Sequence, residues 1–268
     1  MEIIHNIEEG ELSAADLVLD LLITHPEPQM TVQALARAGE IMGISTPSVR
    51  VALTRLLDQE RIVKTARGRY AVQLQGNSVH YEVQHWFEKE SRLGPWSGGW
   101  LVVHDGAVSR SDKTAWRHHS RALDLNGFRP LAAGISVRPD NLDGGAQAMR
   151  SALARFGMAA DSLLFSGSDF DAVAADRMMK LWDVPALSAA YRSALTLIAG
   201  SSARVARMTP EAAARETLLV GRTVIRGIVR DPLLPEAIQP GEPRRALIQA
   251  TRAYQAHART LWHTLLGD

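Results

Sequence analysis

Hydrophobic residues in the first sixty positions recur at helical spacing in three short stretches. The first stretch predicts a helix over 14–24, which opens at the capping box Ser13-x-x-Asp16 and ends before Pro26. The second predicts a helix over about 32–42, which Gly43 ends. Only a tight turn separates this helix from the third, so the three stretches predict a small helical bundle.

The third helix follows Ser45-Thr46-Pro47 and has two chemically different faces. Val49, Leu53, Leu56 and Leu57 share one face at 100° per residue and would pack on the first two helices. Val51, Thr54, Arg55 and Asp58 point away from that face, with Ser48 and Arg50 on its flanks. The candidate DNA contacts of this helix are Thr46, Ser48, Arg50, Val51, Thr54 and Arg55. A short helix, a glycine turn and a helix of this kind form the helix-turn-helix pattern, whose outward residues meet base edges in the DNA major groove. Arginine is the usual bidentate partner of guanine there.

A basic hairpin is predicted directly after these helices. Two β-prone runs flank a glycine over about 62–72, as in the wing of a winged helix. Lys64, Arg67 and Arg69 lie on this hairpin and would contact phosphates or the minor groove, which positions a protein on DNA without specifying the sequence. The alternative interpretation is a three-helix protein-interaction module whose arginines face water.

Strands and helices then alternate in the middle of the chain. We expect strands over about 100–103, 128–131, 135–138 and 162–165, and helices over about 111–125 and 147–156. This βαββαβ order is that of a ferredoxin-like domain.

The rest of the chain is predicted to be helical. Proline and capping signals divide it into helices over about 184–198, 210–227 and 244–266, with an extended connector over 230–236. We therefore expect an α+β protein with a winged helix-turn-helix domain over 1–76, a ferredoxin-like middle domain over 77–170 and a helical C-terminal domain over 171–268.

Composition and charge narrow the function classes. The chain has 268 residues, of which 46% are hydrophobic, and it has no cysteine, which excludes disulfides, thiolate metal sites and cysteine nucleophiles. Its net charge is only +1, yet 44–72 holds six basic and two acidic residues, and such a local basic block favours phosphate contact. The start lacks the features of a secretory signal, and no run approaches the ~20 apolar residues of a membrane span, so we expect a cytoplasmic protein with no membrane partner.

Three ordered groups of residues carry a family resemblance over nearly the whole chain. The first group is Gly43-Ile44-Ser45 leading into Ser48-Val49-Arg50-x-Ala52-Leu53-x-Arg55-Leu56. The second is Gly99-Trp100-Leu101-Val102 with Leu125-x-Gly127-Phe128-x-Pro130-Leu131-x-x-Gly134-Ile135-x-Val137-Arg138-Pro139. The third is Leu181-Trp182-Asp183, Ala189-Ala190-Tyr191 and Arg230-Asp231-Pro232-x-Leu234-Pro235. Together they resemble the PaaX-type transcriptional repressors of phenylacetate degradation.

The resemblance implies a function as well as a fold. It implies a winged-helix DNA-binding domain, a middle domain shaped like a CRISPR-associated ferredoxin-like nuclease, and a helical C-terminal domain for effector binding and dimerisation. It further implies a homodimer on a palindromic operator in double-stranded DNA, released by an aryl-acetyl coenzyme A thioester, typically phenylacetyl-CoA. We therefore expect a repressor of an aromatic catabolic operon.

An effector of this kind needs cations for its phosphates and an apolar slot for its acyl group. Arg222, Arg226 and Arg230 recur at four-residue spacing and would make one helix face positive. Trp182 and Tyr191 are the nearest aromatic candidates in the sequence. The alternative is that the tryptophan belongs to the core and that the arginines are solvated or paired with acidic residues.

A metal-dependent nuclease is the rival hypothesis, because such enzymes place an aspartate at the end of their first strand. Asp105 occupies this position here, although it is equally a turn residue before a glycine. His118 and His119 are adjacent and point about 100° apart on a helix, and His257 and His263 are six residues apart, so neither pair suits one metal ion. Without an acidic cluster or a glycine-rich phosphate loop, we expect no enzyme, no metal site and no cofactor.

Overall fold

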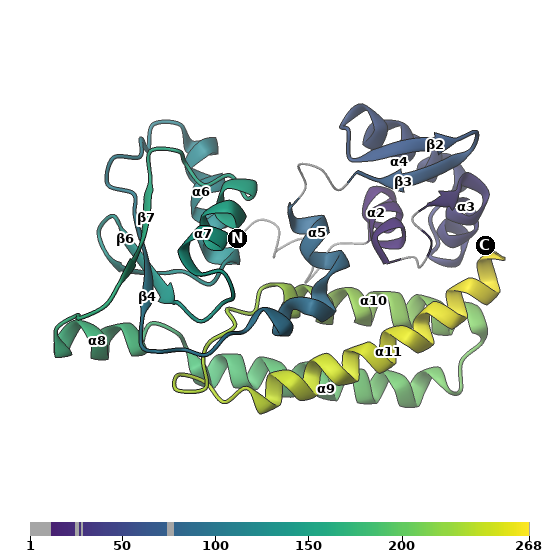
Figure 1. Cartoon of the computed structure of the whole chain (residues 1–268). Helices are drawn as coiled ribbons and strands as arrows, with labels where there is room; N and C mark the ends of the chain where they lie inside the picture. The colour runs from purple at the N-terminus through teal and green to yellow at the C-terminus, as the bar shows by residue number, and fades with distance from the viewer. Residues whose placement is uncertain (1–11, 25–26, 28, 74–77, 268) are drawn as a thin grey trace. The chain divides into compact units, whose positions relative to one another are not determined.

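The computed structural model describes residues 12–24, 27, 29–73 and 78–267, and it combines helices with two antiparallel sheets (Figure 1). The α+β class predicted from the sequence is confirmed. The chain divides into two compact units. The first unit comprises Met1–Gln84, Ala194–Arg226 and Gln249–Asp268, and the second comprises His85–Ser193 and Gly227–Ile248.

The first unit begins with three helices and a small sheet. The helices are α2 (Ala14–Thr24), α3 (Val32–Ile41) and α4 (Thr46–Asp58), and the strands are β1 (Met30–Thr31), β2 (Ile62–Ala66) and β3 (Arg69–Val72) in the order β1-β3-β2. The short helix α5 (Ser78–Gln84) follows. The three predicted helices and the hairpin are confirmed, whereas β1 and α5 were not expected. The predicted helix stop at Pro26 and the expected boundary between residues 76 and 77 lie outside the described residues.

Local side-chain chemistry sets the bounds of these helices. The Ser13 hydroxyl accepts the backbone N–H of Asp16 at 3.1 Å, and the Thr31 hydroxyl accepts that of Ala34 at 3.0 Å. Between α3 and α4 the chain turns at Gly43, whose φ of +76° favours a residue without a Cβ. Pro47 stands in the first turn of α4, where a missing N–H costs nothing.

The core of the first unit joins residues far apart in the sequence. Leu17, Leu35 and Leu53 lie in one hydrophobic cluster from α2, α3 and α4. Ala214 on α10 (Pro210–Val229) and Trp262 on α11 (Glu242–Leu266) belong to the same cluster. The three N-terminal helices therefore complete their core with residues about 200 positions further along the chain.

The second unit contains the predicted βαββαβ order. Its elements are β4 (Trp100–His104), α6 (Lys113–Leu125), β5 (Arg129–Ala132), β6 (Ile135–Pro139), α7 (Gly145–Arg155) and β7 (Leu163–Gly167). The sheet order is β5-β6-β4-β7 with every neighbouring pair antiparallel, and α6 and α7 cover one face (Figure 1). Leu101, Phe128 and Leu153 lie in the core under that face. The opposite face packs against Trp182 and Met178, the latter on α8 (Ala172–Met179).

The C-terminal helices belong to both units. Helix α9 (Val184–Val205), α10 and α11 are each divided between the two, and the 3₁₀ helix Trp86–Arg92 lies in the second. The observed units thus differ from the expected segments 1–76, 77–170 and 171–268, because the division falls within each long helix. No helix within the described residues is long and apolar enough to cross a membrane.

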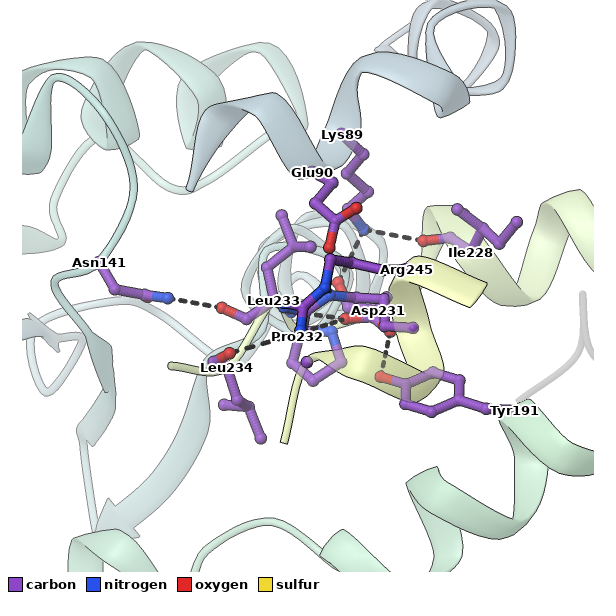
Figure 2. A network of polar contacts seen from close by, with 12 residues as sticks. Lys89, Glu90, Asn141, Tyr191, Ile228, Asp231, Pro232, Leu233, Leu234 and Arg245 are labelled. Atoms are coloured by element: carbon purple, nitrogen blue, oxygen red, sulfur yellow. Dashed lines mark hydrogen bonds and ion pairs between the residues drawn. The ribbon is translucent and has the colours of Figure 1, made fainter. Parts of the chain in front are cut away.

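A buried polar network holds the connector after α10 in the second unit (Figure 2). The Lys89 ammonium donates to the carbonyl oxygens of Ile228 at 3.2 Å, Asp231 at 2.7 Å and Val229. The amide of Asn141 donates to the Leu233 carbonyl at 2.7 Å. Lys89 thus satisfies carbonyls at the end of α10, which a helix leaves without internal donors.

The first unit contains a buried histidine whose neutral form is favoured. Arg61 donates from Nη2 to Nε2 of His80 at 2.9 Å, and burial together with the Arg61 charge lowers the pKa of His80 to about 4. Because the pKa of His80 is lower in the folded protein than in the unfolded chain, the folded state is favoured while the side chain is neutral. This contribution to stability is present above pH ~6.5 and is lost as the pH falls towards 4. Wild-type protein should therefore lose about 2 kcal/mol from this residue between pH 7.5 and pH 5.

Urea unfolding of wild type and His80→Gln at these two pH values checks the expectation, because glutamine accepts a hydrogen bond but does not titrate. The variant should show a smaller stability difference between the two pH values. Equal pH dependence in both proteins would contradict the assignment.

Candidate nucleic-acid interface

Helix α4 is held by a cap at its N-terminus and by apolar packing of its inner face, which leaves its other face outward. Ser45 is the N-cap, and its hydroxyl accepts the N–H of Ser48 at 3.3 Å. Val49, Leu53 and Leu56 are buried, and Leu57 is partly buried, as the sequence predicted. This packing fixes the helix with its polar and basic side facing solvent.

The predicted base-reading residues are brought together on that outward side. Ser48, Arg50, Val51, Thr54 and Arg55 are exposed, and Thr46 is partly buried. The Thr54 hydroxyl donates to the Arg50 carbonyl at 3.2 Å, so its remaining acceptor capacity and its methyl group face outward. Val51 is 68% exposed, which is unusual for an apolar side chain and suits contact with a thymine methyl group.

The β2–β3 hairpin carries the three predicted wing cations. Lys64 and Arg67 are exposed and Arg69 is half-buried. The register shifts between Lys64 and Ala66, and Gly68 turns the chain with a positive φ. The neighbouring Thr65 hydroxyl donates to Oε1 of Gln29 at 2.6 Å, which ties the hairpin to the chain before β1.

The cations of α4 and the hairpin differ from three other arginines of the first unit in having no acidic partner among the described residues. Among the described residues, Arg50, Arg55, Lys64, Arg67 and Arg69 form no ion pair. By contrast, Arg37 pairs with Glu40 and Glu211, Arg204 pairs with Glu216, and Arg222 pairs with Asp16 and Asp20. We call these five cations the basic face. Their uncompensated charge can attract an external polyanion.

The predicted effector residues divide between the two units, with Trp182, Tyr191 and Arg230 in the second and Arg222 and Arg226 in the first. In the second unit, Trp182 is buried and stacks on Trp100 with ring centroids 6.2 Å apart. The Tyr191 hydroxyl is buried and donates to the Asp231 carboxylate (Figure 2). Both aromatic side chains are thus packed inside the second unit, and for Trp182 this is the alternative that the sequence left open. Arg230 lies near Arg121, and burial together with its charge lowers the pKa of Arg121.

The other two effector candidates, Arg222 and Arg226, line a pocket in the first unit. Arg222 donates to the carboxylate of Asp20 and lies 3.3 Å from that of Asp16. Burial raises the pKa of Asp20 to about 6 even though the arginine charge opposes this. Asp20 and Trp262, which also line the pocket, were missed, because no local pattern links positions so distant in sequence.

The rival catalytic position contains a buried hydrogen-bonded pair. His119 Nδ1 accepts the N–H of Ala159 at 3.2 Å, so Nε2 carries the proton and donates to Oδ2 of Asp105 at 3.1 Å. Both ring nitrogens are thus occupied in structural hydrogen bonds. Within the part of the chain that the structure describes, no group of three or more histidine or acidic residues could hold a metal ion.

Comparisons with known proteins inform the fold alone. No family model matches the chain, and no curated protein matches it. Among solved structures, the uncharacterized protein Rv0674 from Mycobacterium tuberculosis is similar, with a TM-score of 0.65 and 22% sequence identity over 95% of this chain and 99% of that chain. The arrangement of elements therefore exists in another protein, and the name of that protein gives no function.

Proposed function

We propose that this protein is a DNA-binding transcriptional regulator that uses the outward face of α4 and the β2–β3 hairpin. The observation that carries the proposal is the basic face, whose five cations have no acidic partner among the described residues. A phosphate backbone supplies the missing negative charge. The apolar and small polar side chains between these cations suit the base edges of a major groove.

The order of elements supports a winged helix-turn-helix for the N-terminal segment. Helix α3, the Gly43 turn and α4 follow the helix-turn-helix pattern, and the antiparallel hairpin follows as the wing. The β5-β6-β4-β7 order supports a ferredoxin-like middle domain, as in the PaaX-type repressors that the sequence resembles.

The side chains divide into two roles under this proposal. Ser48, Arg50, Thr54 and Arg55 approach base edges, whereas Lys64, Arg67 and Arg69 hold the phosphate backbone. The protein acts as a homodimer on a palindromic operator, since helix-turn-helix dimers bind paired half-sites. It represses an operon for aromatic, phenylacetate-like catabolism and is released by an aryl-acyl effector, for which phenylacetyl-CoA is the first compound to test.

A fluorescence-anisotropy titration against the DNA upstream of its own coding sequence tests the function. It should be run at 50 and 200 mM salt, with and without phenylacetyl-CoA. Tight binding that weakens with salt and is reversed by the thioester would support both the regulator and its effector. Binding that ignores the thioester would keep the regulator and reject this effector, whereas no binding at 50 mM salt would reject DNA binding in favour of a protein-interaction module.

The wing gives a quantitative prediction. Arg67→Ala should weaken binding to all DNA sequences alike and should make the slope of log K against log salt shallower by about 1, because one phosphate contact is lost. Arg215→Ala is a matched control, because Arg215 is also exposed but lies on α10 away from the basic face. An unchanged slope in Arg67→Ala would show that Arg67 makes no phosphate contact.

The nuclease alternative keeps one favourable observation. Oδ1 of the buried Asp105 carboxylate has no hydrogen-bond partner among the described residues, and the residue lines a hollow with Arg110 and Trp116. Metal-dependent cleavage of nucleic acid that Asp105→Ala abolishes would establish this function in place of regulation.

A further inference from the structure

The first unit contains a pocket that lies apart from the elements of the basic face and is formed by other helices. It is lined by residues of α2, α5, α10 and α11, and its cavity volume is about 70 Å³. Leu218, Ile225, Trp262 and Leu266 give it apolar walls. A pocket with mostly apolar walls and a few placed polar groups is the usual form of a small-molecule site.

The charged residues that line the pocket are predominantly cationic. Arg222, Arg226 and Arg259 contribute three positive charges, and Asp20 is the acidic residue of the described lining. The side chains of Arg222 and Asp20 are only 13% and 21% exposed. Arg222 also lies 3.3 Å from the carboxylate of Asp16, so a ligand with a negative charge would have to exchange with these carboxylates, and its bond to the arginine would be shielded from water.

A second observation also suggests a missing ligand. Trp262 is 7% exposed, and its buried indole N–H has no hydrogen-bond partner among the described residues. Buried donors without an acceptor cost free energy, and in native proteins they often mark a place that another molecule occupies. An oxygen of a bound acid would supply the acceptor.

We propose that this pocket binds a small apolar acid, aromatic or aliphatic, whose carboxylate displaces Asp20 from Arg222 and whose body packs against Trp262, Leu218 and Ile225. Burial raises the pKa of Asp20 to about 6, so its displaced carboxyl takes up a proton more readily than that of an exposed aspartate. The ligand differs from a coenzyme A thioester in that the acid end itself enters the pocket. A neutral molecule of the same shape lacks this bond.

The ligand would act on the helix that supports the DNA-binding face. Arg222 on α10 contacts both Asp16 and Asp20, which lie one turn apart on α2. Helix α2 packs in turn against α4 in the core of the first unit. Displacing Asp20 would loosen the attachment of α2 to α10 and lower affinity for DNA. This regulatory half rests on the proposed function, whereas binding of the acid does not.

The binding half is tested with 1-anilinonaphthalene-8-sulfonate, an aromatic anion that fluoresces in apolar surroundings, and with the neutral N-phenyl-1-naphthylamine. Arg222→Gln and Arg226→Gln should each lower the affinity for the anionic probe at least tenfold. Asp20→Asn should raise that affinity several-fold by removing the competing carboxylate. The affinity for the neutral probe should change less than threefold in all three variants. Arg215→Gln on the exposed side of α10 is the matched control and should alter neither probe.

The opposite effects of Asp20→Asn and Arg222→Gln separate specific binding from loss of structure, because an unfolding variant would not bind the anion more tightly. Should Arg222→Gln fail to fold, Arg226→Gln and a pocket-filling Ala258→Phe variant provide the comparison, and the latter should exclude both probes. Equal affinities of the anionic probe for wild type, Asp20→Asn and Arg226→Gln would overturn the proposal.

Competition by phenylacetate and by phenylacetyl-CoA then separates the free acid from the thioester. Displacement of the anionic probe by the acid supports the proposal, and displacement by the thioester alone overturns it. DNA binding is measured in parallel with the same ligands. Acid binding without any DNA binding would reject the proposed function and leave the pocket assignment standing, whereas DNA binding that is insensitive to a bound acid would overturn the coupling through α2.

Discussion

Replacing Arg55 by alanine is expected to cost about 1–3 kcal/mol of binding free energy on the operator and far less on scrambled DNA. Arg55 is exposed on the outward side of α4, and it forms no ion pair with a described residue that would compete for its guanidinium. A bidentate contact with guanine discriminates among bases, so its loss should lower the ratio of specific to non-specific affinity. Anisotropy titrations with operator and scrambled duplexes at the same salt concentration give that ratio.

Arg67→Ala is the comparison, because it should lower the affinity for both duplexes by the same factor. If Arg55→Ala also lowered the affinity for both duplexes equally, Arg55 would be a phosphate contact. The division of roles between helix and wing would then be wrong. The exposed Asp58 at the end of the same helix gives a second control, since Asp58→Ala should not lower specificity.

Replacing Lys89 by methionine is expected to destabilise the protein by roughly 3–5 kcal/mol. The side chain is 6% exposed, and its ammonium donates to three carbonyl oxygens around the end of α10. Methionine has a similar length but no donor, so these buried carbonyls would lose their partner, and each such loss costs about 1–3 kcal/mol. Urea unfolding monitored by tryptophan fluorescence measures the change.

Lys180→Met provides the control, because Lys180 is 72% exposed and pairs with Asp176 one helical turn away. Exposed pairs of this kind contribute only about 0.3–0.5 kcal/mol. A destabilisation of Lys89→Met that is no larger than that of Lys180→Met would show that the network in Figure 2 does not hold the connector.

Local signals in the sequence predicted the elements well. The start of the predicted helix over 14–24 is confirmed by α2, because its capping box acts within one turn. The outward face of α4 was also predicted, since periodicity alone sorts Val49 and Leu53 from Arg50 and Thr54. The basic face is therefore a local property of about 30 residues.

The pocket and the division into units could not be predicted in this way. Arg222 and Asp20 are separated by 202 positions, and a single sequence contains no signal that joins them. The four-residue spacing of Arg222, Arg226 and Arg230 indicated one helix face, but α10 continues from the first unit into the second near residue 227, and its arginines meet different neighbours. Trp182 and Tyr191 became core residues for the same reason, because their packing partners Trp100 and Asp231 are distant in sequence.

The long-range core of the first unit has a consequence for synthesis on the ribosome. Leu17 and Leu53 share a cluster with Ala214 and Trp262, so the N-terminal helices cannot bury their apolar faces fully until residues near 262 have been made. During translation, which adds about 5–20 residues per second, α2, α3 and α4 can pack on one another early, whereas the apolar surface that Ala214 and Trp262 cover stays exposed for more than ten seconds. A product cut short by premature termination would therefore carry every cation of the basic face on a core with an uncovered apolar side, so truncation should cost stability and solubility before it costs charge.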